Sequence, residues 1–92
     1  MAHTLDELVE LQHAADRAHD RARELREAFG PPTVEQWTEG QRAMYETALR
    51  AWRDLDRDTT DAITRYAKNE ALDRSAVERT VRSRVEERQE EE

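Results

Sequence analysis

One group of side chains in this sequence has the types and spacing that could bind a metal. His13, Asp16 and Asp20 follow one another at intervals of three and four residues. A helix would place this imidazole and these two carboxylates on one face, and both groups are ligands of Zn²⁺. No second cluster of such residues completes a coordination sphere. Since 40% of the chain is charged, we interpret the group as a solvated helix surface and expect no metal and no cofactor.

Catalytic chemistry has equally little support in the sequence. The chain has no cysteine, so a thiol nucleophile, a disulfide framework and a zinc–thiolate site are excluded. Its two serines, Ser75 and Ser83, have no histidine nearby in the sequence. No glycine-rich loop is present that could bind phosphate groups. We therefore expect no enzyme and no small-molecule substrate.

The composition predicts a single small domain with a thin core. Leu, Ile, Val and Phe account for 14 of the 92 residues, and the net charge is −7. Regular spacing of the apolar residues nevertheless favours a folded chain, which a second copy could help to stabilise. No apolar run is long enough to cross a bilayer, and no leader sequence opens the chain, so we expect a cytoplasmic protein without a membrane partner.

The first predicted helix spans about residues 4–29. Thr4 followed by Glu7 forms a capping-box pattern at its start. Apolar residues then recur at alternating steps of three and four, which is typical of a coiled-coil seam: Leu8, Leu11, Ala15, Ala18, Ala22, Leu25 and Phe29. Glycine followed by two prolines at 30–32 ends this helix.

A connector at residues 30–38 leads to a second predicted helix at about 39–71. Thr38 with Gln41 forms a capping box, and Thr33 with Gln36 is the alternative start. The apolar residues of this helix fill an arc of roughly 160°, wider than one packing partner requires. Folding the two helices into an antiparallel hairpin brings Phe29 near Trp37, and it brings Trp52 against the alanine-rich middle of the first helix.

A third, shorter helix is predicted at about residues 74–88. Asp73 is its expected N-cap, with Leu72 and Val77 in the positions of a hydrophobic staple. Because no glycine or proline separates it from the second helix, a continuous helix is the alternative. Val77, Val81 and Val85 could cover Leu5, Val9, Ile63 and Tyr66 of the hairpin. The acidic tail at 86–92 should fray, since it places negative charge at a helix carboxyl end.

These elements predict an all-α fold, an antiparallel, coiled-coil-like helical hairpin with a third helix, arranged as a three-helix bundle or as a dimeric bundle. The surplus apolar arc of the second helix suggests a protein-interaction module that forms a homodimer or binds another protein. The expected interface is a set of large apolar side chains on the second helix: Tyr45, Leu49, Trp52, Ile63 and Tyr66.

An alternative rests on residues 63–82, which resemble a generic helix-turn-helix. Ala67, Leu72, Asp73 and Val77 match the small residue, the turn, the polar cap and the buried valine of that family. Ala71 departs from it by replacing the usual turn glycine. The resemblance implies DNA contacts by Arg74, Ser75, Arg79 and Arg82. The acidic net charge argues against a nucleic-acid partner, because DNA affinity depends on neutralising phosphates.

Overall fold

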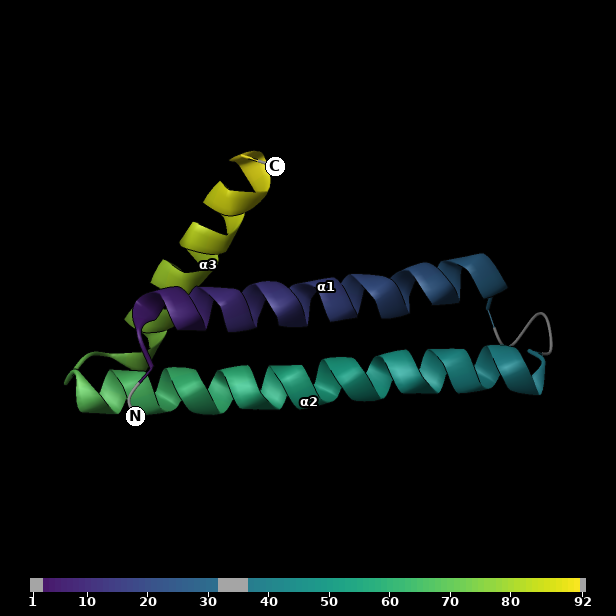
Figure 1. Cartoon of the computed structure of the whole chain (residues 1–92), viewed down its shortest axis with the longest axis horizontal. Helices are drawn as coiled ribbons and strands as arrows, with labels where there is room; N and C mark the ends of the chain where they lie inside the picture. Colours follow the sequence, from purple (N-terminus) through teal and green to yellow (C-terminus); the bar gives the residue numbers. More distant parts are fainter. Residues whose placement is uncertain (1–2, 32–36, 92) are drawn as a thin grey trace.

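The described residues form three helices, as the sequence predicted. The computed structural model describes residues 3–31 and 37–91, in which α1 spans Leu5–Phe29, α2 spans Glu39–Asn69 and α3 spans Arg74–Glu91. Helices α1 and α2 lie side by side and antiparallel, while α3 crosses one end of this hairpin and points away from it (Figure 1). The all-α fold class is therefore confirmed. None of the helices in the described part is long and apolar enough to cross a membrane.

Helix caps and an edge-on aromatic contact fix the end of α1 and the start of α2 at the hairpin turn. The Gly30 amide, at φ 79°, donates to the Arg26 carbonyl at 3.0 Å and closes α1. The Trp37 indole N–H donates to the Gly30 carbonyl at 2.8 Å, and its ring meets Phe29 edge-on at 5.6 Å. Thr38 begins α2 with both hydrogen bonds of a capping box to Gln41. The alternative start at Thr33 and Gln36 lies outside the described residues.

The fully buried core is concentrated at the end of the hairpin that α3 crosses. The three α3 valines are at most 3% exposed, and they pack with residues from both other helices. Valines at four-residue spacing form a narrow stripe, which suffices to cover one end of a hairpin. The members of this core cluster are Leu8, Val9, Ala62, Ile63, Ala67, Val77, Val81 and Val85, with Leu5, Leu11 and Tyr66 packed against them.

A Schellman motif separates α2 from α3. The Leu72 amide donates to the Ala67 carbonyl at 2.8 Å, and the Ala71 amide donates to the Lys68 carbonyl at 3.3 Å. This geometry needs a left-handed residue, and Ala71 adopts it with φ 55°. Alanine in that conformation is strained, because its Cβ approaches the following carbonyl oxygen. The helices are thus two, and the continuous alternative is not the conformation of this structure.

The acidic tail, which the sequence was expected to leave frayed from residue 86, is drawn as helix as far as Glu91. Two contacts with α1 explain the difference. Val85 is fully buried, and the Arg88 guanidinium donates to Glu10 at 2.6 Å. These contacts hold the last turns of α3 against the unfavourable charge at its carboxyl end.

Replacing a core leucine tests where the stability of this fold lies. Leu8→Ala should lower the free energy of unfolding by about 2–5 kcal/mol, because Leu8 is 0% exposed and its removal leaves a cavity. Leu72→Ala is the matched control, since Leu72 is 52% exposed, and it should cost less than about 1 kcal/mol. Urea unfolding followed by helical circular dichroism measures both, and equal losses would contradict a core at this end.

Ala71→Gly should raise the free energy of unfolding by about 1 kcal/mol, because glycine adopts the left-handed conformation without a Cβ penalty. The same substitution at Ala51, in the middle of α2, should lower it by about 1 kcal/mol. Thermal unfolding of the two variants separates these effects by their sign. A loss of stability in Ala71→Gly would mean that the turn is not strained.

Candidate interaction surface

The half of the hairpin beyond α3 lacks a complete core. We call this part the distal hairpin: residues 17–29 of α1 and residues 39–58 of α2. In α2 the first buried residue is Thr59, so no side chain from Glu39 to Asp58 is fully buried. Tyr45, Leu49 and Trp52 are each half-buried there. Two helices alone can bury one stripe each, and the rest of the wide apolar arc of α2 stays in contact with water.

Tyr45 and Leu49 lie on the same side of α2 as the residues that α3 covers near the carboxyl end of α2. Tyr45 precedes Ile63 by 18 residues and Leu49 precedes Ala67 by 18, which is five turns in each case. Ile63 and Ala67 are each 4% exposed in the core cluster with the α3 valines. Tyr45 and Leu49 therefore continue the same stripe into a region where α3 no longer covers it. We call this stripe, with Trp52 beside it, the aromatic face.

Aromatic contacts order the side chains of this face. The Trp37 and Tyr45 rings meet edge-on with centroids 5.1 Å apart, which extends the Phe29–Trp37 contact along α2. Trp52 lies against His19 at 4.9 Å with the rings tilted by 59°. Such ring pairs stabilise the fold beyond the effect of burying apolar surface, and they fix the orientation of the rings. Trp52 thus packs on His19 at the edge of α1, and it remains partly accessible to a partner.

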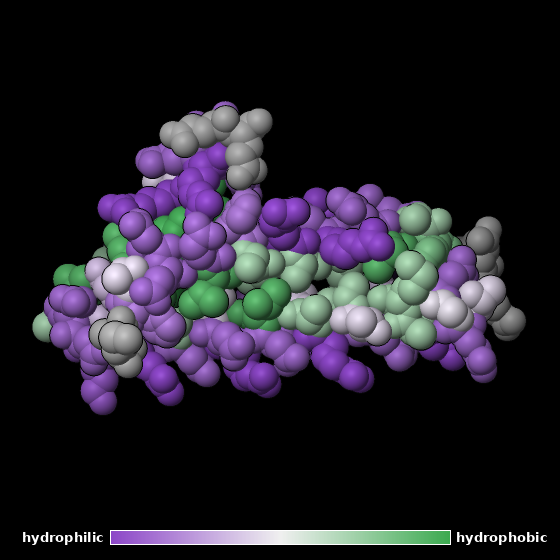
Figure 2. Space-filling view, in the orientation of Figure 1, coloured by the Kyte–Doolittle hydropathy of each residue, from purple (hydrophilic) through white to green (hydrophobic). Residues whose placement is uncertain are grey.

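A second apolar area occurs on the distal hairpin, and the sequence interpretation did not single it out. It is a shallow depression of about 480 Å³, bordered by residues of both helices: Arg21, Leu25, Ala43, Met44, Thr47, Ala48 and Ala51. Met44 is 49% exposed. An apolar band also runs along the seam between α1 and α2 on the face shown in Figure 2. The seven-residue spacing of Met44 and Ala51 was the available signal for this area.

Two of the five predicted interface residues do not belong to the distal surface. Ile63 is 4% exposed and is part of the core beneath α3. Tyr66 packs against that core and borders a small depression with Leu5, Leu72 and Val77. Both are covered by the same chain, because α3 crosses α2 at this level. Tyr45, Leu49 and Trp52 are the predicted residues that remain available.

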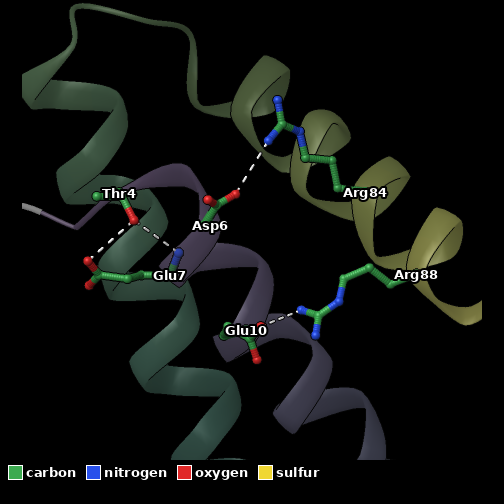
Figure 3. Close-up of polar contacts among 6 residues, drawn as sticks. All are labelled: Thr4, Asp6, Glu7, Glu10, Arg84 and Arg88. Carbon is green, nitrogen blue, oxygen red and sulfur yellow. Dashed lines mark hydrogen bonds and ion pairs between the residues drawn. The ribbon is translucent and has the colours of Figure 1, made fainter.

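The arginines of α3 mostly face acidic residues of the same chain. Arg82 donates to Asp16 at 2.5 Å, Arg88 to Glu10 at 2.6 Å, and Arg84 lies 3.6 Å from Asp6. The last two of these contacts between α3 and α1 are drawn in Figure 3. We call the three together the α1–α3 ion pairs.

Of the four residues that the helix-turn-helix resemblance assigns to DNA, two are in ion pairs. Arg74 pairs with Glu78 at 3.2 Å within α3, and Arg82 pairs with Asp16 of α1. Ser75 and Arg79 are exposed, and Arg79 borders depressions that also contain Glu10, Glu78 and Glu86. A phosphate approaching this helix would meet carboxylates together with the arginines, which weakens its attraction.

His13, Asp16 and Asp20, whose spacing could suit a metal, do not form a cluster of ligands in the described residues. Asp16 accepts hydrogen bonds from Gln12 and Arg82, and Asp20 pairs with Arg23. Within residues 3–31 and 37–91, no group of three histidine or carboxylate side chains is placed to hold a metal ion. The Nδ1 atom of His13 is buried without a hydrogen-bond partner. Elsewhere, the hydrogen bond with His3 at the start of α1 lowers the pKa of the exposed Glu7 carboxyl.

Asp16→Asn should weaken the docking of α3 by about 1 kcal/mol, because the Asp16 side chain is only 23% exposed and loses a charge-assisted contact with Arg82. Hydrogen exchange of the Val81 and Val85 amides measures this docking directly. Asp20→Asn is the control: its pair with Arg23 is more than half exposed on both sides and should change exchange by less than about 0.5 kcal/mol. Unchanged protection in Asp16→Asn would show that the valines alone hold α3.

No known protein family matches this chain, and no curated protein or solved structure is significantly similar to it.

Proposed function

We propose that the protein is a small helical interaction module, without catalytic activity, that associates with a second copy of itself through the aromatic face. Tyr45, Leu49 and Trp52 form the centre of this contact. The observation that carries the proposal is the absence of any fully buried side chain between Glu39 and Asp58 of α2. An apolar stripe that α3 covers at one end, and that no third helix of the described residues covers at the other, is suited to a helix from a partner.

The residue types of the aromatic face favour this role over a solvated surface. Tyrosine and tryptophan are enriched at the centres of protein interfaces, because they bury a large area with few rotatable bonds. Exposed pairs such as Asp54–Arg57, at 3.2 Å, lie on the same helix. Charged residues around an apolar centre are typical of an interface rim. Two hairpins packed by these faces would form a four-helix bundle, and a helix of another protein could occupy the same stripe.

DNA binding by α3 has less support as an alternative. Two of its four candidate residues, Arg74 and Arg82, are in ion pairs, and the net charge of the chain is −7. Phosphate binding requires free cationic groups on one face. A retardation assay with mixed-sequence duplexes at low salt separates the two functions, and we expect no shift.

Light scattering over a micromolar concentration range tests the self-association. The wild-type chain should approach twice its 10.8 kDa mass, and Trp52→Ala should raise the dissociation constant at least about 30-fold, as expected for a central interface aromatic. Met44→Ala is the matched control, because Met44 is exposed in the other apolar area of the distal hairpin. A greater effect of Met44→Ala would place the interface there, and a monomer at every concentration would reject self-association.

A further inference from the structure

The turn between α2 and α3 holds a strained residue that a different conformation would relax. Ala71 has φ 55°, in the left-handed region that alanine rarely adopts. The segment from Asn69 to Asp73 contains no glycine and no proline. If Ala71 became helical, α2 and α3 would form one helix from Glu39 to Glu91, about 80 Å long at 1.5 Å per residue. Each backbone group of the turn would then bond within the helix.

If this turn straightened, α3 would leave the hairpin of its own chain, but it could still dock on the hairpin of a second copy. The valine cluster and the ion pairs place α3 against the first half of α1, as far as Asp16, and against the end of α2. They consist of the valine stripe and the α1–α3 ion pairs, in which Asp6, Glu10 and Asp16 face Arg84, Arg88 and Arg82. An identical hairpin in a second copy offers the same apolar groove and the same acidic groups in the same order.

We propose that this protein can exchange α3 between two copies, with Ala71 as the hinge. In the exchanged dimer α2 and α3 are continuous, and each α3 docks on the hairpin of the other copy through the contacts seen here within one chain. Short connections under strain favour such exchange, because opening releases the strain while the closed contacts are remade in the partner. The occupant of the groove is thus the α3 of a second copy. This association uses the end of the hairpin that α3 crosses, whereas the aromatic face lies beyond it and consists of other residues.

Complementary charge reversal tests whether α3 docks between chains. One variant carries Glu10→Arg and Asp16→Arg in α1, and the other carries Arg82→Glu and Arg88→Glu in α3. Both also carry Trp52→Ala, so that association through the aromatic face does not obscure the result. Alone, each variant sets like charges against each other and should be a monomer with reduced helicity. After the two are mixed in urea and refolded, exchange should produce a one-to-one dimer with restored helicity.

A variant with all four charge reversals in one chain, also carrying Trp52→Ala, is the control. It should dock α3 within the chain, which would show that the reversed pairs are tolerated. A mixture that stays monomeric, measured by light scattering, while this control is fully helical would overturn the proposal. Failure of the aromatic-face proposal would be visible separately, in the wild-type chain and its Trp52→Ala variant.

The role of Ala71 is tested by placing Ala71→Gly in both members of the mixture. Glycine relieves the strain of the closed turn and weakens a continuous helix, and each dimer contains two such hinges. The dissociation constant of the mixed dimer should therefore rise about a hundredfold or more. A dimer whose affinity is unchanged by Ala71→Gly would show that α2 and α3 do not join at this residue, and it would reject the hinge.

Discussion

The packing of three α3 valines against one end of the hairpin is the interaction on which the rest of this structure depends. Val77, Val81 and Val85 cover Leu8 and Ile63, and almost all large buried side chains of the described residues lie in this cluster. A hairpin of two amphipathic helices is marginal by itself, because each helix has a side without a neighbour. Where α3 provides that neighbour the apolar residues of both helices are buried, whereas beyond it Ala22 and Leu25 of α1 are buried but Tyr45, Leu49 and Trp52 of α2 are only half-buried. The core cluster with large buried side chains from all three helices therefore ends where α3 turns away.

Much of this arrangement could be predicted from residue spacing. The heptad series of α1 and the glycine–proline turn indicated a hairpin, and its register followed from the turn, as the contact between Phe29 and Trp37 shows. The covering role of the valines followed from their four-residue steps. These features depend on the spacing of apolar residues along a helix and on the restricted backbone conformations of glycine and proline turns, and both can be read from the sequence.

The features that could not be predicted depend on single conformations or on long side chains. The cap signal at Asp73 indicated a break between α2 and α3, but the left-handed conformation of Ala71 in that break had no signal in the residue type. The contact of the Trp52 ring with His19, within the alanine-rich middle of α1, depends on side-chain orientation and had no signal in the residue spacing. The α1–α3 ion pairs depend on the angle at which α3 crosses α1, and sequence distance carries no information on that angle. For the same reason, residues 63 and 66 were assigned to an interface that α3 already covers.

The two proposed modes of association follow from one constraint, which is that this chain has too few large apolar residues to cover a hairpin along its whole length. One end is completed by a helix joined through a strained turn, so the covering element is the part of the fold that can change partners. The other end keeps Tyr45, Leu49 and Trp52 half-buried, so the surface itself is available. Because the two sites consist of different residues of the hairpin, one association does not use the side chains of the other. Copies that use both could therefore join end to end, and the number of chains in an assembly would depend on the balance between closed and exchanged α3.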